Sequence, residues 1–114
     1  DGFNVVYRKL TIQRAIAQEY DFKVCHSTPF FWAYIMASGD VYGCSAYLED
    51  ERFCYGNLSE KKFQKIWEGE KRRKNFHFIK DDLNIEDCRM NCRMWSANQY
   101  LWELDHPGPH NNFV

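Results

Sequence analysis

Five cysteines constrain the fold of this chain more than any other feature. They are Cys25, Cys44, Cys54, Cys88 and Cys92, within 114 residues. An odd count leaves one thiol unpaired in any disulfide scheme. The sequence starts with neither an initiator Met nor a basic and then apolar leader for export, and a reducing cytoplasm disfavours disulfides. Metal ligation is therefore the leading use of these cysteines.

Two pairs of cysteines can meet at one centre. Cys88 and Cys92 enclose three residues, a spacing that can bring both thiolates to one metal group. Cys25 and Cys44 flank a predicted β-hairpin, which can return its two ends to one place. Together the pairs predict a four-thiolate cage, which suits an iron-sulfur cluster or a structural zinc ion. The alternative for any single cysteine is a small, buried hydrophobic side chain.

Length and charge narrow the function classes. A chain of 114 residues is one domain by default, spanning 1–114. Its 15 Lys and Arg against 16 Asp and Glu give a net charge of -1, without the basic surplus of a nucleic-acid binder. The longest apolar run, 30–37, is far shorter than the roughly 20 residues of a membrane helix. We expect a cytoplasmic chain that is a piece of a longer polypeptide, with no nucleic-acid or membrane partner.

Hydrophobic periodicity predicts a helix and then a hairpin in the first half of the chain. Residues 7–22 place apolar side chains at helical spacing among charged ones, which predicts an amphipathic helix. Residues 30–37 are aromatic and follow Pro29, which favours a strand, and the turn residues at 38–40 lead to a second strand at 41–44. The polar segment 49–57 is expected to be a loop.

Two further helices are expected in the second half. Ser59 is the expected N-cap of the first and Gly69 its C-terminal signal, with three apolar residues on one face: Phe63, Ile66 and Trp67. The cations at 71–74 extend this helix, with a solvated face as their default role. The second helix follows Cys92, with apolar residues at helical spacing up to Leu104. Pro107 and Pro109 exclude regular helix from the tail.

Two motifs near Cys88 and Cys92 imitate other sites. Together with His106 and His110, the Cys88–Cys92 pair fits the spacing of a two-Cys, two-His zinc finger. The two prolines between the histidines prevent the helix that such a finger needs. The pair also imitates the Cx3Cx2C loop that holds the catalytic cluster of radical S-adenosylmethionine (SAM) enzymes. Trp95 stands in place of the third Cys, and tryptophan cannot ligate iron, so this chain alone should not cleave SAM.

Several weak motifs occur in a specific order along nearly the whole chain. Cys25 precedes FFWAYI, and then follow GDVYGC ending at Cys44, GNL at 56–58, FQKIW at 63–67 and CRMNC from Cys88 to Cys92. In this order the chain resembles the auxiliary-cluster domain of radical SAM enzymes, known as the SPASM domain and, in its shorter form, the twitch domain.

The resemblance implies an α+β fold, a small β-hairpin followed by helices, folded around one iron-sulfur cluster. It assigns one [4Fe-4S] cluster to four ligands: Cys25, Cys44, Cys88 and Cys92. Five cysteines are too few for two cysteine-ligated cubanes. Cys54 lies outside the family pattern and is expected to be a free thiol.

The chain departs from its full-length relatives just before the Cys88–Cys92 pair. Those relatives carry a C-x2-C pair there, and Ile79 and Asp82 occupy the two places in this sequence. In those relatives the residue matching Cys88 serves the second cluster.

Three further residues near the ligands have two interpretations each. Arg89 and Arg93 either tune the cluster or contact substrate, or they simply face solvent. His26 either replaces a ligand or is a surface imidazole.

By the same resemblance the chain is the C-terminal cluster domain of a radical SAM oxidoreductase, which relays an electron from the substrate or helps to bind it. It would hold no catalytic residue of its own. Residues 1–24 would be a helical connector from the radical SAM core, which binds SAM and a second [4Fe-4S] cluster, and residues 105–114 an irregular tail. Expected partners are that core, the substrate and an external electron donor or acceptor. The alternative is a structural four-cysteine zinc module for protein contacts.

Overall fold

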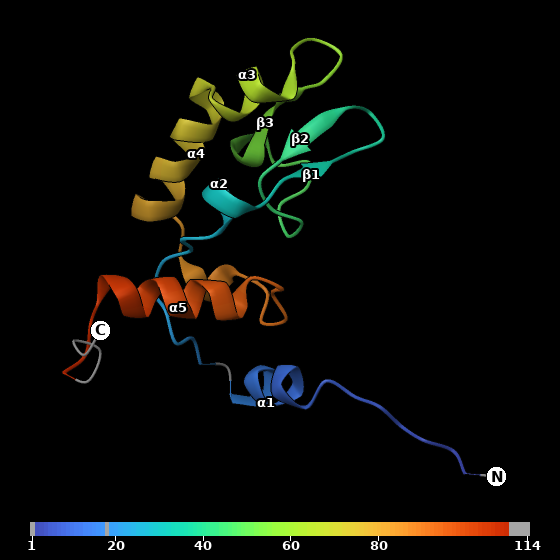
Figure 1. Cartoon of the computed structure of the whole chain (residues 1–114), viewed down its shortest axis with the longest axis vertical. Helices are drawn as coiled ribbons and strands as arrows, with labels where there is room; N and C mark the ends of the chain where they lie inside the picture. The colour runs from blue at the N-terminus through green and yellow to red at the C-terminus, as the bar shows by residue number, and fades with distance from the viewer. Residues whose placement is uncertain (1, 18, 110–114) are drawn as a thin grey trace.

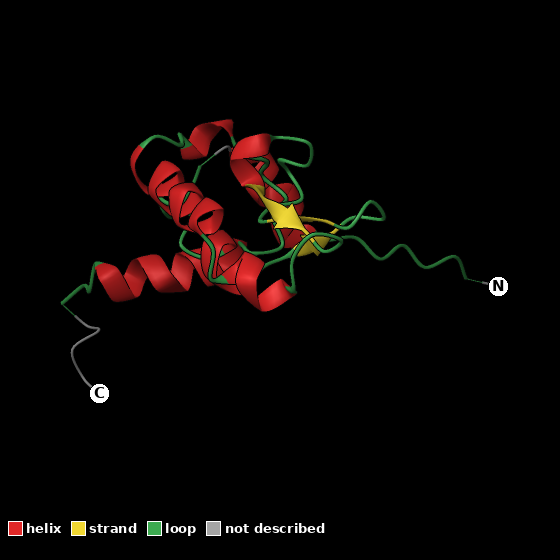
Figure 2. Cartoon of the chain, turned by 90° about the horizontal axis from the view of Figure 1, so that it is seen from above, coloured by secondary structure: helices red, strands yellow, loops and turns green. Residues whose placement is uncertain are grey.

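The computed structural model describes residues 2–17 and 19–109 (Figure 1). The described residues form α1 (Lys9–Ala17), α2 (Thr28–Phe31), β1 (Tyr34–Ile35), β2 (Asp40–Tyr42), β3 (Cys54–Asn57), α3 (Phe63–Trp67), α4 (Glu70–Asp81) and α5 (Trp95–Asp105), with two 3-10 turns, η1 (Glu51–Phe53) and η2 (Ile85–Asp87). Most of the regular secondary structure is helical, and the sheet is small (Figure 2). The predicted α+β class is confirmed.

The sheet is antiparallel, with strand order β1-β2-β3. Tyr34 faces Tyr42 across the first pair of strands, so the predicted hairpin is confirmed. Its turn depends on Gly39, which has a φ of +88°, a left-handed conformation that glycine adopts without a Cβ clash. The Asn57 amide donates to the Ser38 carbonyl at 3.0 Å, which ties β3 to the same turn.

Two predictions around this sheet are wrong in part. Residues 30–37 do not form one strand, because Phe30 and Phe31 lie in α2, where Pro29 in the first turn has the φ that a helix start requires. Segment 49–57 is not a loop, because it contains η1 and β3. Phe53 and Tyr55 within it are 1% and 3% exposed, so burial of these two rings overrides the polar character of their neighbours.

The helix predicted from Ser59 begins later. Lys62 is the N-cap residue of α3, and the Ser59 N–H donates instead to Asn57 Oδ1 at 2.7 Å, which holds Ser59 in a turn. Gly69 ends this helical segment as predicted, and it is also the N-cap residue of a separate helix, α4. A Cβ on Gly69 would lie 2.9 Å from the Lys65 carbonyl oxygen, so the close approach of the two helices favours glycine here.

Arg72 corrects the expectation that the cations at 71–74 are all solvated. Its guanidinium donates to the Pro29 carbonyl at 2.7 Å and to the Trp67 carbonyl at 2.6 Å. It also lies 4.1 Å from the centre of the Trp67 ring, a cation–π distance. Arg72 therefore joins α4 to α2 and to the end of α3.

The N-terminal helix is shorter than predicted and lies apart from the other elements in Figure 1. α1 has no buried residue, and its nearest aromatic contact is Arg14, 5.0 Å from the Trp95 ring centre. The radius of gyration is 17.0 Å, against about 13 Å for a compact domain of 100 residues, because this N-terminal part extends outward. Tyr20, predicted as part of the helix, lies beyond it and stacks on Trp95 at 4.9 Å.

The helix after Cys92 is confirmed as α5, and Pro107 and Pro109 follow it without helical structure. Residues 110–114 of the predicted tail, with His110 of the zinc-finger pattern, lie outside the described residues. In the part that the structure describes, every helix is too short or too polar to cross a membrane.

Six of the eight buried apolar residues that the structure describes form two separate groups. The α5 cluster contains Phe22, Ile85 and Trp95, and the sheet cluster contains Val41, Tyr55 and Ile66. Figure 1 shows the same division, with α5 in one layer and the sheet with α3 and α4 in the other. The other two, Phe53 and Ile79, line a pocket with residues of the α5 cluster.

Gly43 is buried beside the sheet cluster. The Tyr55 hydroxyl donates to Asn75 Oδ1 at 2.9 Å, and a Cβ on Gly43 would overlap that hydroxyl and lie 2.5 Å from Tyr55 Cζ. The Asn75 amide in turn donates to the Arg52 carbonyl at 2.8 Å, so the tyrosine hydroxyl is fixed through Asn75 and cannot move aside freely. A side chain at position 43 would therefore disturb the turn that leads to Cys44.

Gly43→Ala should lower the free energy of unfolding by about 1–3 kcal/mol, the usual range for overpacking a filled core. Urea denaturation followed by circular dichroism measures it. Gly108→Ala is the matched control, because nothing lies within 4 Å of a Cβ at Gly108. Equal stability of the two variants would contradict this interpretation of Gly43.

Candidate metal centre

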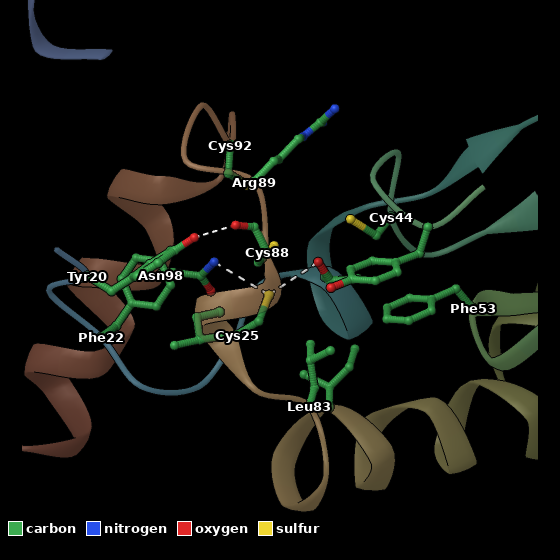
Figure 3. Close-up of a pocket in the computed structure, with 14 residues that line it drawn as sticks. Tyr20, Phe22, Cys25, Cys44, Phe53, Leu83, Cys88, Arg89, Cys92 and Asn98 are labelled. Carbon is green, nitrogen blue, oxygen red and sulfur yellow. Dashed lines mark hydrogen bonds between the residues drawn. The ribbon is translucent and has the colours of Figure 1, made fainter. Parts of the chain in front are cut away.

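Four of the five cysteines line one pocket (Figure 3). These pocket cysteines come from three segments: Cys25 precedes α2, Cys44 follows β2, and Cys88 and Cys92 lie between η2 and α5. The space between the lining atoms is about 390 Å³, part of it open to solvent. Segments more than sixty residues apart in the chain therefore bring together the four thiols that the sequence predicted as ligands.

The walls of this pocket are largely apolar or aromatic. Phe22 and Ile85 come from the α5 cluster, while Phe53, Ile79 and Leu83 close the opposite side. Such a shell limits water access to a metal group and so influences its potential. Ile79, one of the two positions at which the resemblance implies an extra cysteine in relatives, is 1% exposed and part of the apolar wall in this chain.

Cys54 and His26 lie outside this pocket. Cys54 lines a separate, open groove together with Tyr42 and Lys71. His26 follows Cys25 in sequence, but its ring faces Trp102, with 6.2 Å between the ring centres. Cys54 is thus separate from the four pocket cysteines, whereas His26 shares a second hollow with Cys25, outside the pocket of the four.

Asn98 on α5 holds the Cys25 segment in place. Its Oδ1 accepts from the backbone N–H groups of His26 at 2.8 Å and Ser27 at 2.9 Å. Its Nδ2 donates to Cys25 Sγ at 3.4 Å, and Cys25 Sγ also contacts Thr28 Oγ1 at 3.3 Å. Sequence reasoning missed Asn98, although a polar residue three positions after Trp95, on the buried face of a helix, is a signal for such a role.

Backbone N–H groups lie next to two other thiols. The Ala46 N–H donates to Cys44 Sγ at 3.4 Å, and the Met94 N–H donates to Cys92 Sγ at 3.4 Å. In both cases the donor is two residues after the cysteine, as in a tight turn. Donors of this kind stabilise the thiolate form, the form that ligates metals.

The loop from Cys88 to Cys92 is fixed at two points. The Tyr20 hydroxyl donates to the Cys88 carbonyl, and the Arg89 guanidinium donates to the Ser45 hydroxyl. The second bond ties this loop to the segment of Cys44. In Figure 3 the Arg89 side chain extends away from Cys88, so its charge acts at the rim of the pocket.

Burial dominates the ionisation of three pocket cysteines. It raises the pKa of Cys44 and Cys92, and it raises the pKa of Cys88 to about 11, with further upward contributions from neighbouring pocket cysteines. Thiolates held side by side in this half-buried pocket therefore favour a cationic group among them. This donor set fits a metal group and is poorly suited to remain charged without one.

The pocket cysteines surround the space instead of gathering at one point. Across residues 2–17 and 19–109, no three His, Cys, Asp or Glu side chains are close enough to hold a single metal ion. Around one zinc ion, with Zn–S bonds of about 2.3 Å, tetrahedral sulfur atoms stand only about 3.8 Å apart. A polynuclear cluster places several iron atoms between its ligands, so its thiolates stand farther apart.

Asn98→Ala should weaken metal retention, because it leaves the N–H groups of His26 and Ser27 without their acceptor. Each orphaned, buried N–H costs about 1–3 kcal/mol, so we expect a lower free energy of unfolding and reduced iron content after anaerobic reconstitution. Urea denaturation and an iron assay measure the two effects. Ser96→Ala, at an exposed position of the same helix, is the control. Iron content equal to that of Ser96→Ala would show that the amide does not position Cys25.

Comparison with known protein families gives one match. The family model SPASM, described as an iron-sulfur cluster-binding domain, matches residues 25–93, which is more than half of the chain. The matched span begins at Cys25 and ends one residue after Cys92, so it contains all four pocket cysteines. No curated protein and no solved structure matches the chain.

Proposed function

We propose, for a chain that belongs to the SPASM family of iron-sulfur cluster-binding domains, that the four pocket cysteines hold one [4Fe-4S] cluster. The observation that carries the proposal is their convergence from three chain segments on one largely apolar pocket: Cys25, Cys44, Cys88 and Cys92. Four cysteine thiolates are the usual ligand set of such a cluster. That Cys88 lines the same pocket as the other three cysteines supports its assignment as the fourth ligand.

A cluster suits this pocket better than the zinc ion of the alternative interpretation. A structural zinc site is closed around one ion and leaves no space between its ligands. Here the four cysteines share their pocket with aromatic residues such as Phe53 and Phe22, which form part of the wall. The position of Ile79 in that wall supports one cluster in this chain, because it removes a ligand that a second cluster would use.

SPASM domains occur together with radical SAM cores, and we extend that setting to this chain. The cluster would supply a site that gains or loses one electron, next to a substrate radical made by the core. The chain's own residues would exclude water with Phe22, Phe53 and Ile85, and Arg89 would hold the Cys44 and Cys88 segments together through Ser45. The proposed activity of the whole protein is that of a radical SAM oxidoreductase in a reducing cytoplasm.

Residues 1–24 are the proposed connector to the core. Their apolar side chains are largely uncovered: Phe3 is 94% exposed, Val6 88% and Ile16 77%. A neighbouring core domain of the same polypeptide would cover them. On this proposal the core binds SAM and a second [4Fe-4S] cluster, residues 105–114 remain an irregular tail, and the core, the substrate and an external electron donor or acceptor are the partners.

Anaerobically reconstituted protein should be brown and contain iron and sulfide, whereas a zinc module would be colourless. Serine in place of any pocket cysteine should sharply lower the iron and sulfide content, since a buried hydroxyl is a poor substitute for a thiolate. Cys54→Ser should keep both, because Cys54 lines a different groove. Iron and sulfide assays with the visible spectrum measure this. An equal iron loss in Cys54→Ser would reject the ligand assignment.

The reconstituted chain should yield no 5'-deoxyadenosine from SAM. Trp95 occupies the place of the third cysteine of a SAM-cleaving loop, and it is 1% exposed and packed against Phe22 at 5.1 Å, so it belongs to the α5 cluster. The cluster should nonetheless be reduced and reoxidised reversibly. Dithionite and SAM are added under anaerobic conditions, and the nucleoside is assayed by chromatography. Repeated turnover would mean that Cys88 and Cys92 belong to a catalytic loop.

A further inference from the structure

Tyr47 carries a buried hydroxyl that the site described so far does not use. Its oxygen is inaccessible to solvent, and within the described part of the chain it has no hydrogen-bond partner. Buried hydroxyl groups in proteins nearly always have a partner, because losing water without replacement is unfavourable. The neighbouring buried tyrosine, Tyr55, follows that rule by donating to Asn75. The exception at Tyr47 therefore calls for a ligand.

The position of Tyr47 indicates where that ligand lies. The residue lines the same pocket as the four cysteines and sits three residues after Cys44, and its backbone N–H donates to the Cys44 carbonyl at 3.3 Å. Its ring stacks on Phe53, with 4.3 Å between the centres and 5° between the planes. One backbone hydrogen bond and one ring stack thus fix the side chain. The hydroxyl cannot turn out to water without breaking the stack on Phe53.

The charges around Tyr47 agree with this placement. Burial raises the pKa of Tyr47 to about 12, and the next upward contributions come from Cys88 and then Cys44. At neutral pH the hydroxyl therefore keeps its proton and can only act toward anionic sulfur as a donor.

We infer that the Tyr47 hydroxyl donates a hydrogen bond to a sulfur atom of the bound cluster, on the side of Cys44 and Cys88. The inference rests on the proposed cluster site and adds to it a residue that makes the cluster easier to reduce. With four thiolates, the cluster unit goes from a net charge of -2 to -3 when it gains an electron. A fixed O–H dipole stabilises the more negative state more strongly, as hydrogen bonds to cluster sulfur do in general.

The test compares reduction potentials of reconstituted wild-type protein, Tyr47→Phe and Tyr100→Phe. Phenylalanine at position 47 keeps the stack on Phe53 and removes only the hydroxyl. Tyr100 is 60% exposed on α5, so its variant is the matched control. Potentiometric titration followed by electron paramagnetic resonance should show a potential in Tyr47→Phe that is lower by up to about 59 mV, a fall of up to tenfold in the reduced-to-oxidised ratio for one electron. Tyr100→Phe should match the wild type.

A second variant tests the same bond in the opposite direction. Site-specific 3-fluorotyrosine at position 47 keeps the ring and the hydroxyl but makes the O–H group a stronger donor, so the potential should rise. A purely structural role for Tyr47 would not give shifts of opposite sign. This variant also provides the answer if Tyr47→Phe does not fold or does not take up iron.

The outcomes separate this inference from the proposed function. Wild-type protein without iron and sulfide would reject the cluster site itself. Equal potentials of iron-loaded wild-type protein and iron-loaded Tyr47→Phe would reject only the hydrogen bond. If Tyr47→Phe does not take up iron, equal potentials of the wild type and the 3-fluorotyrosine protein would reject it in the same way. A lower potential in the first variant, or a higher potential in the second, would support it.

Discussion

Four half-buried thiols in one pocket are the constraint on which the rest of this structure depends. Burial raises the pKa of Cys44, Cys88 and Cys92, and neighbouring cysteines raise these three pKa values further. As thiolates they would repel one another in surroundings of low polarity. A cationic metal group removes that conflict, so binding the group and assembling the pocket become one free-energy change, as in other small metal-binding domains.

The same pocket explains how a small chain can be stable with two small hydrophobic clusters instead of one larger core. The α5 cluster and the sheet cluster each contain only three buried residues, and a core of that size contributes little stability by itself. The pocket draws cysteines from both layers, with Cys44 from the sheet layer and Cys88 and Cys92 from the segment before α5. It has Phe22 on one wall and Phe53 on the other. A bound cluster would therefore act as a third core, in contact with both layers.

The sequence predicted the site better than it predicted the elements around it. Cysteine spacing and motif order identified the four residues that line the pocket, because ligand chemistry depends on residue type. The start of α3 and the strand β3 could not be predicted in the same way. Ser59 has the right type for an N-cap but is bound to Asn57 in a turn, and Cys54–Asn57 became a strand only because Tyr55 is buried and bonded to Asn75. Both outcomes depend on contacts distant in the chain, because Asn57, which binds Ser59, is itself bonded to Ser38, and Tyr55 is bonded to Asn75.

Buried polar side chains, more than hydrophobic area, determine where the pocket cysteines stand. Asn98 fixes the segment of Cys25 through two backbone N–H groups, and Asn75 holds Tyr55 so that Gly43 and then Cys44 can pass beside it. Hydrogen bonds are directional, whereas apolar contacts permit small shifts, so these amides define positions that apolar packing alone would leave loose. A cluster with fixed Fe–S bond lengths needs such positions. The sparse hydrophobic core and the well-bonded polar side chains of this domain are thus two consequences of building a fold around a metal group.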